Sequence, residues 1–384
     1  MFANVYQEYV VAQLGEAMSE NLSEVLSKNS RRKQQVIDTF DPSGVGLNNG
    51  NIFGFPFDYE TADVIILGVP WEVTVSFHSG TAKGPGSVLS ASPQLDFYDY
   101  DNPEGWKQGI YMPPVPSWIL LENERLRSVA ESVVLATEQG RLPEPTDLAE
   151  VNAGGDRLNT WLKLETQKAL ALGKKVGVVG GDHSVPLGAI QALAEHHRDR
   201  GDAYGNDFGI LHIDAHCDLR EAYQGFTFSH ASIMRNVLAL PQVSRLVQVG
   251  VRDVSAKEVA FAENSDGRVV LHHDTGVKRS RYAGTPWKTL CQEIVADLPS
   301  KVYISFDIDG LDPKLCPSTG TPVPGGLELE EAFCLIREVV EAREIIGFDL
   351  CEVGPDEWDG NVAARIVYKL CNLMGLSAKS GPLL

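Results

Sequence analysis

The stretch FGILHIDAHCD, residues 208–218, decides the fold of this chain. Its first six residues are mostly apolar and do not alternate with charged ones, which is typical of a strand buried on both faces. Asp214, His216 and Asp218 then follow at alternate positions. Two further stretches have the same form, VGVVGGDHS at 176–184 and VYISFDIDG at 302–310. The sequence therefore predicts buried strands whose carboxyl ends carry acidic and imidazole side chains.

Four more apolar, β-branched runs extend this pattern along the chain, at 64–67, 246–251, 269–271 and 345–350. Helical periodicity lies between many of the runs, at 157–172, 186–197, 285–298, 328–340 and 359–374. Alternation of strand and helix predicts an α/β fold with a mainly parallel sheet covered on both faces. Because ligands bind beyond the carboxyl ends of such strands, the polar stretches are expected to converge there.

The first 60 residues differ from the rest and are interpreted as a helical arm with a linker, ahead of a catalytic domain at 61–384. Apolar residues recur every fourth position, which indicates an amphipathic helix that packs on its own domain or contacts another subunit; they are Tyr6, Val10, Leu14, Met18, Leu22 and Leu26. Residues 98–150 are rich in proline and aromatic residues. They are interpreted as a structured insertion that forms a lid or a subunit contact.

Composition excludes several classes of protein. The 384 residues carry 33 Lys and Arg against 52 Asp and Glu, a net charge of −19, which argues against a nucleic-acid partner. No apolar run reaches the roughly 18 residues of a membrane span, and the first 30 residues lack the apolar block of a secretory signal. The six cysteines are scattered without a CxxC pair, so we expect a reduced, cytoplasmic protein.

The acidic stretches predict a site for two divalent ions. In an extended chain Asp214, His216 and Asp218 point to one side, and Asp307 and Asp309 do the same from another strand. With His183 they make two imidazoles and four carboxylates, whose mutual repulsion is balanced by two divalent cations. His212 lies deeper in its strand and is interpreted as a core residue or as a support behind a ligand.

Two further residues are candidates for the chemistry. His230 follows Ser229, a plausible helix N-cap, and a histidine near a metal site can shuttle protons at neutral pH. Glu352 ends the last apolar run, where a carboxylate facing the site can bind a planar cation in bidentate fashion.

Four motifs together resemble the ureohydrolase superfamily of arginase and agmatinase: GGDHS at 180–184, DAHCD at 214–218, SFDIDGLDP at 305–313 and FDLCEVGP at 348–355. The resemblance covers roughly 60–378. It implies a three-layer α/β/α fold with a sheet of about eight strands, assembled into homotrimers or homohexamers. It also implies that Asp214 and Asp307 bridge two metal ions. On this resemblance one ion is held by His183, Asp214, Asp218 and Asp307. The other is held by Asp214, His216, Asp307 and Asp309.

The implied reaction is attack of a metal-bridging hydroxide on a guanidinium carbon, with release of urea. The resemblance assigns His230 to proton transfer, Glu352 to guanidinium binding and Asp309 to the nitrogen of the tetrahedral intermediate. The long arm and the 98–150 segment most resemble the nickel-dependent guanidine hydrolases of cyanobacteria and other bacteria. Ser255 stands where arginases carry an ammonium-binding carboxylate, which disfavours free arginine.

The favoured function on this resemblance is therefore hydrolysis of guanidine to urea and ammonia, with Ni²⁺ preferred to Mn²⁺ and nickel-delivery proteins as expected partners. The alternative is an agmatinase or a guanidino-acid hydrolase such as guanidinobutyrase. A non-catalytic metal-binding subunit is the alternative among proteins that are not enzymes. The presence of all six candidate ligands, of His230 and of Glu352 favours an enzyme.

Overall fold

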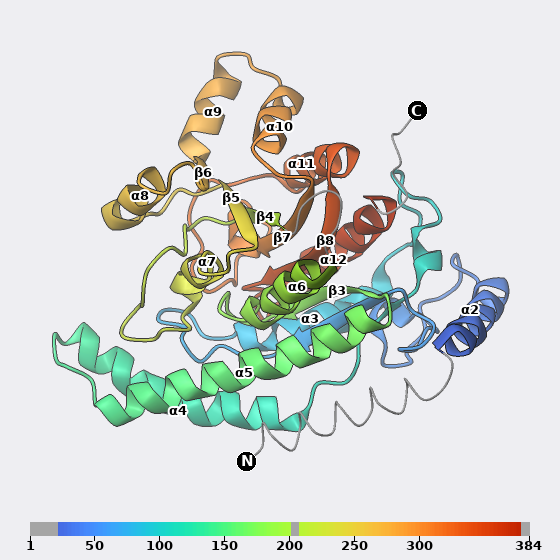
Figure 1. Ribbon diagram of the computed structural model, residues 1–384, viewed down its shortest axis with the longest axis horizontal. Coiled ribbons are helices and arrows are strands. Elements are labelled where there is room, and N and C mark those ends of the chain that lie inside the picture. Colours follow the sequence, from blue (N-terminus) through green and yellow to red (C-terminus); the bar gives the residue numbers. More distant parts are fainter. Residues whose placement is uncertain (1–21, 201–206, 378–384) are drawn as a thin grey trace.

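A single sheet of eight parallel strands organises the computed structural model, which describes residues 22–200 and 207–377 (Figure 1). Its spatial order is β2-β1-β3-β8-β7-β4-β5-β6, and every neighbouring pair is parallel. The strands are β1 (Val64–Val69), β2 (Ile110–Tyr111), β3 (Lys175–Gly180), β4 (Phe208–Ile213), β5 (Val243–Val249), β6 (Val269–His272), β7 (Lys301–Asp307) and β8 (Glu344–Cys351). The expected α/β architecture with about eight strands is confirmed.

Burial explains why the strand sequences lack strict alternation. Every residue of β1, β4 and β7 is buried, and β8 is buried except at its first residue. A parallel strand with helices over both faces needs apolar residues at consecutive positions, because neither face contacts water. The seven apolar runs all become strands. The edge strand β2 has only two residues, and no run in the sequence indicated it.

Two groups of helices flank the sheet (Figure 1). In one group α3 (Gly84–Ala91) packs on α12 (Glu357–Ser377), which packs on α11 (Leu329–Ala342), and α11 packs on α10 (Trp287–Ala296). In the other α4 (Ser117–Glu138) packs on α5 (Pro145–Ala171), which packs on α6 (Leu187–Arg200). The remaining described α-helices of the domain are α7 (Ile233–Val237), α8 (Ala256–Glu263) and α9 (Asp274–Tyr282).

The described part of the N-terminal arm is the helix α2 (Leu22–Thr39), and it packs on its own domain. Val36, Ile37 and Phe40 contact the main core, and Lys33 Nζ donates a hydrogen bond to the carbonyl oxygen of Gln108 at 2.7 Å. The proposed apolar stripe is only partly covered, because Leu26 is 41 % exposed. Tyr6, Val10, Leu14 and Met18 lie outside the described residues.

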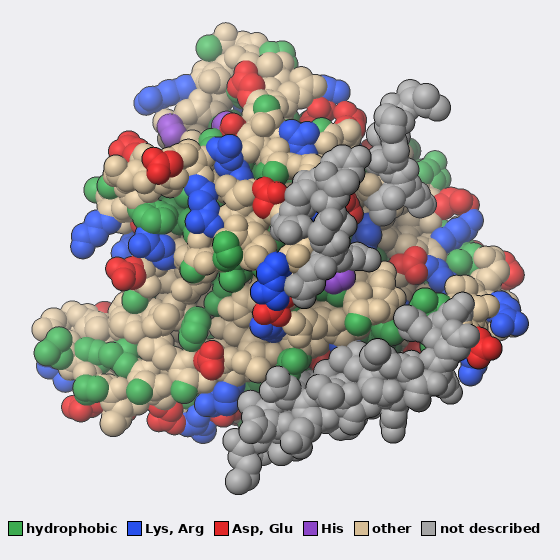
Figure 2. All heavy atoms as spheres, in the orientation of Figure 1, with side chains coloured by type: hydrophobic (Ala, Val, Ile, Leu, Met, Phe, Trp, Pro, Cys, Tyr) green, Lys and Arg blue, Asp and Glu red, His purple; other side chains and the backbone are tan. Residues whose placement is uncertain are grey.

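Three remaining expectations concern the cysteines, membrane spans and surface charge. All six cysteines are free, as the scattered spacing indicated. Among the described helices none is long and apolar enough to cross a membrane. On the face shown in Figure 2, Lys and Arg side chains are interspersed with Asp and Glu and form no continuous basic stripe.

Candidate metal centre

Four neighbouring strands bring the polar stretches together. His183 follows β3, Glu352 follows β8, Asp307 ends β7 and Asp214 follows β4, and these strands are adjacent in the order β3-β8-β7-β4. Because the strands are parallel, their carboxyl ends meet at one edge of the sheet. Residues separated by as many as 169 positions therefore come into hydrogen-bond contact there.

The first group of ligand atoms surrounds the His183 imidazole. His183 Nδ1 lies 3.1 Å from Asp214 Oδ2, 3.3 Å from Asp218 Oδ2 and 3.2 Å from Asp307 Oδ2. An octahedral ion with bonds of about 2.1 Å separates its adjacent ligand atoms by about 3.0 Å. All four side chains are nearly inaccessible to solvent. The spacing, burial and donor types of His183, Asp214 and Asp218 therefore fit one divalent ion, and Asp307 lies beside this group without belonging to it.

The second group forms around His216. Its Nδ1 lies 3.3 Å from Asp214 Oδ1 and 3.1 Å from Asp309 Oδ2, and these three residues form a separate potential metal site. Asp214 thus directs one carboxylate oxygen to each group. Asp307 directs Oδ2 to the first group, while its Oδ1 accepts a hydrogen bond from the Asp309 amide at 2.8 Å. Asp214 therefore has the geometry of a bridging ligand more clearly than Asp307.

His212 supports Asp214 from inside the strand. Gln248 Nε2 donates to the Cys217 carbonyl oxygen and to His212 Nδ1, each at 2.8 Å. Since Nδ1 accepts this bond, Nε2 of a neutral ring carries the proton, and it lies 2.9 Å from Asp214 Oδ2. His212 is close enough to count among the potential ligands of the first group. Its ring, held by Gln248 and in close contact with Asp214, instead fits the interpretation as a support behind a ligand.

Burial makes this cluster costly to charge without cations. Burial, followed by the negative charge of Asp214, raises the pKa of Asp218 to about 6. Burial and the carboxylates of Asp309 and Asp214 raise the pKa of Asp307 well above its usual range. Burial opposes ionisation of Asp214, but His212, His183 and His216 outweigh it and hold its pKa well below the usual range. Bound cations would offset the cost of ionising these buried carboxylates, as expected of a metal site.

His230 begins the short 3-10 helix η5 (His230–Ser232), and the side chain of Ser229 caps it by accepting from the Ala231 amide at 3.2 Å. This is the capping that the sequence indicated. The imidazole lines the cavity above the cluster. Burial, with the neighbouring His216 and His183, lowers its pKa to about 4, so the ring is neutral at pH 7. Its Nδ1 lies 3.4 Å from Thr74 Oγ1.

Glu352 follows β8 in a left-handed backbone conformation, with φ of 62°. Its Oε1 accepts a hydrogen bond from the His183 amide at 2.9 Å, and its own amide donates to the Gly181 carbonyl oxygen at 2.7 Å. Burial and the nearby Asp182 raise the pKa of its carboxyl well above the usual range. A guanidinium cation bound here would oppose that shift, so the carboxylate is suited to hold one.

The cavity over the cluster has a volume of about 340 Å³. Its outer wall includes Arg220, Tyr223, Asp253 and Ser255. Ser255 Oγ donates to Glu258 Oε2 at 2.7 Å as part of the capping box of α8, so this hydroxyl already has a partner. None of the described cavity residues comes from 98–150. The interpretation of that segment as a lid or a subunit contact therefore stays a prediction.

Four residues that the sequence analysis did not single out complete the surroundings of the site. Ser305 Oγ lies 2.9 Å from His183 Nε2 and donates to Asp349 Oδ1 at 3.1 Å, so both residues orient this imidazole from behind. Thr74 and Asp182 contact each other at 3.1 Å beside His230. Asp182, Ser305 and Asp349 lie within the quoted motifs, whereas nothing in the local pattern indicated Thr74.

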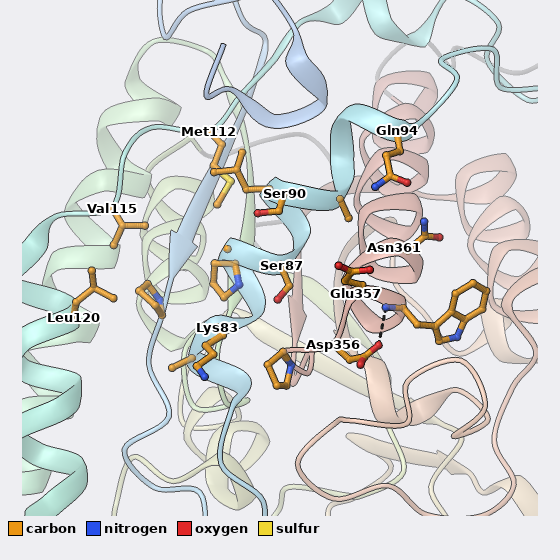
Figure 3. A pocket seen from close by; sticks show the side chains of 18 residues that line it. Lys83, Ser87, Ser90, Gln94, Met112, Val115, Leu120, Asp356, Glu357 and Asn361 are labelled. Carbon is orange, nitrogen blue, oxygen red and sulfur yellow. Dashed lines mark hydrogen bonds between the residues drawn. The ribbon is translucent and has the colours of Figure 1, made fainter. Parts of the chain in front are cut away.

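A second hollow, of about 980 Å³, lies between α3, the start of α12 and the segment before α4 (Figure 3). Its lining is largely apolar, with Leu89, Met112 and Val115, and Lys83 and Asp356 add charge. It contains no histidine or cysteine among its lining residues. We therefore assign the chemistry to the smaller cavity over the acidic cluster.

Comparison with known proteins gives consistent matches. The sequence matches the arginase family over residues 62–374. It is 33 % identical over 326 residues to an N(1)-aminopropylagmatine ureohydrolase of Thermus thermophilus, covering 83 % of this chain and 93 % of that protein. It is 31 % identical over 316 residues to an agmatinase of Proteus mirabilis, covering 79 % and 86 %. The fold resembles proclavaminate amidino hydrolase from Streptomyces clavuligerus, with a TM-score of 0.66, 22 % identity and coverage of 87 % and 100 %.

Proposed function

The chain belongs to the arginase family and is a ureohydrolase, and from this premise we propose that it releases urea from agmatine or an N-substituted agmatine. The observation that carries the proposal is the pair of ligand groups sharing Asp214, with Glu352 and His230 in the same cavity. The relatives named for agmatine and aminopropylagmatine support an amine-bearing substrate. They support the agmatinase alternative better than guanidine hydrolysis.

The arginase family uses a binuclear centre of divalent metal ions, and the buried His and Asp cluster suits such ions. We assign one ion to His183, Asp214, Asp218 and Asp307, and the other to Asp214, His216, Asp307 and Asp309. When bound, two such ions lower the pKa of water so that hydroxide is available at neutral pH. A shell of two imidazoles and four carboxylates suits Mn²⁺, whereas raw affinity favours Ni²⁺ over Mn²⁺. Nickel stays our prediction on the resemblance to guanidine hydrolases alone.

The side chains of the cavity then have distinct roles. Glu352 binds the guanidinium group by accepting hydrogen bonds from two of its nitrogens. His230 holds its proton on Nδ1 toward Thr74, which leaves Nε2 to take up and deliver a proton to the departing amine. Asp309, a member of the second group, accepts a hydrogen bond from a nitrogen of the reacting centre.

Guanidine hydrolysis is the second candidate, favoured by the charge of Arg220 in the cavity lining. The Arg220 cation at the outer wall repels a second positive charge, whereas the exposed Asp253 carboxylate on the same wall attracts one. Arg220 would also favour the carboxylate of a guanidino acid such as guanidinobutyrate.

A substrate panel tests these proposals. The protein is reconstituted separately with Ni²⁺ and with Mn²⁺, and urea release is measured with agmatine, aminopropylagmatine, guanidine, guanidinobutyrate and arginine. We expect the highest kcat/KM with one of the two agmatines. A clear preference for guanidine would establish the second candidate. No urea from any substrate with either metal would favour the non-catalytic metal-binding subunit.

Members of the arginase family are typically oligomeric and act on guanidino substrates. We propose a homotrimer or homohexamer for this chain, which light scattering coupled to size-exclusion chromatography distinguishes from a monomer. The cytoplasmic compartment stays a prediction, supported by six free cysteines. Nickel-delivery proteins also remain a prediction that follows only if nickel is the metal used.

A further inference from the structure

We propose that Arg127 of α4 is a positioning residue for the catalytic machinery, and that it orients His230 through Thr74. The inference concerns residues 72–80, which follow β1 and are called here the β1 loop. Ser76 of this loop lines the cavity, and Thr74 contacts the His230 imidazole. The kinetic test of this inference rests on the proposed role of His230 in proton transfer, whereas the anchoring of the loop by Arg127 does not.

The hydrogen bonds of Thr74 determine which nitrogen of His230 carries the proton. The Thr74 hydroxyl donates to Asp182 Oδ2 at 3.1 Å, and the Thr74 amide donates to the same oxygen at 3.3 Å. Because its only proton is used in this way, Thr74 Oγ1 acts as an acceptor toward His230. It accepts from the His230 amide at 3.2 Å and faces His230 Nδ1 at 3.4 Å. The proton therefore lies on Nδ1, and Nε2 is free for transfer.

Arg127 holds the two peptide carbonyls on either side of Thr74. Its Nη1 donates to the carbonyl oxygen of Val73 at 3.2 Å and to that of Val75, and its Nη2 lies 3.3 Å from Ser79 Oγ. One turn earlier on α4, the Asn123 side-chain oxygen accepts from the Glu72 amide at 2.7 Å. A planar guanidinium can make these bonds at once, whereas an ammonium group presents a single point of contact.

This arrangement gives the 98–150 segment a supporting role through α4. Its helix α4 stays outside the cavity but fixes the β1 loop that enters it. Glu72 strengthens the far end of the loop, because its Oε2 accepts from the amides of Gly80 and Ala82 at 2.6 and 3.2 Å. Thr74 therefore sits between anchored segments, and loss of the Arg127 anchor is transmitted to His230.

The kinetic test compares Arg127→Met, Arg127→Lys, Thr74→Val and Thr74→Ser with a matched control, Arg125→Met. Arg125 lies on the same helix but pairs with Glu122 and Glu150 at the surface. With agmatine and guanidine as probes, we expect Arg127→Met and Thr74→Val to lower kcat at least about tenfold, the effect of losing one hydrogen bond of about 1.4 kcal/mol. KM and metal content should stay within about twofold of the parent values.

The pattern among variants separates positioning from general destabilisation. Arg127→Lys and Thr74→Ser should recover part of the loss, and Arg125→Met should match the parent. The limb of the pH profile that reports His230 should move to lower pH in Arg127→Met, since loss of the Thr74 acceptor disfavours the imidazolium. Unchanged kcat in Arg127→Met, or an equal loss in Arg125→Met, would overturn the proposal. So would a loss explained by missing metal.

Hydrogen–deuterium exchange tests the same contact without turnover. We expect faster amide exchange across 72–80 in Arg127→Met and parent-like exchange in Arg125→Met. Equal exchange in the two variants would refute the anchoring role of Arg127, whatever the activity. If the parent protein releases no urea but the exchange difference is present, the proposed function fails and the anchoring survives. The two failures are therefore distinguishable.

Discussion

Substitution of Asp218 by Asn separates the stability of the metal-free protein from its capacity to bind metal. Asp218 is only 5 % exposed, and its backbone φ is 54°, a conformation that Asn adopts readily. Asn keeps the shape of the side chain and removes its negative charge. We therefore expect Asp218→Asn to stabilise the metal-free protein and to weaken the metal site.

The pKa of Asp218 sets the magnitude. Burial and the charge of Asp214 raise the pKa from 3.8 to about 6. A rise of that size corresponds to at most about 3 kcal/mol of folding free energy, lost when the carboxylate is charged. Because the folded state holds the proton more tightly than the unfolded state, the penalty is full above pH 6 and disappears as the pH falls toward 3.8. The increase in the free energy of unfolding caused by Asp218→Asn should show the same pH dependence.

The assay is urea denaturation in excess chelator, at fixed protein concentration and at pH values between 4 and 8. We expect the variant to exceed the parent in free energy of unfolding by up to about 3 kcal/mol at pH 7.5 and to match it near pH 4. With Ni²⁺ or Mn²⁺ in excess, the parent should have the higher free energy of unfolding, because metal binding to the folded state stabilises the parent more than the variant. A metal-free variant less stable than the parent at pH 7.5 would refute the reasoning.

Three further predictions follow from the site and the core. His230→Ala should slow urea release while elemental analysis still finds two ions per subunit, and metal loss in that variant would contradict the proton-transfer role. Asp307→Asn should lower metal content as well as activity, because Asp307 Oδ2 lies beside the first group of ligand atoms; full occupancy would exclude it as a ligand. Phe55→Ala should cost about 3–5 kcal/mol in the free energy of unfolding, since Phe55 is fully buried beside Phe97 with ring centroids 4.6 Å apart, and metal content should not change.

The sequence predicts the central sheet well because two-sided burial leaves a strong signal. Strands such as β4 and β7 are continuous apolar runs, and the polar residues begin where each strand ends. Parallel pairing then brings these ends together, so the convergence of His183, Asp214 and Asp307 could be predicted from the sequence alone. The strand β2 had no such signal, because two residues carry no periodicity.

The surroundings of the site were harder to predict, because they depend on contacts between segments far apart in the chain. Thr74 and His230 are 156 positions apart, and no spacing rule relates them. The function of 98–150 was also hard to predict, for a related reason. Its proline and aromatic content indicates an ordered segment, but composition does not say whether that segment enters a cavity or supports the loop that does.

The left-handed backbone at Glu352 has a consequence for laboratory evolution of this protein. A non-glycine residue held at a positive φ costs of order 1–3 kcal/mol, and glycine or asparagine avoids most of that cost. A library randomised at position 352 and selected only for heat resistance should therefore enrich glycine and asparagine, whereas selection for urea production should retain glutamate. Different residues from the two selections would show that Glu352 lowers the thermal stability of the protein and is kept because it binds the guanidinium group.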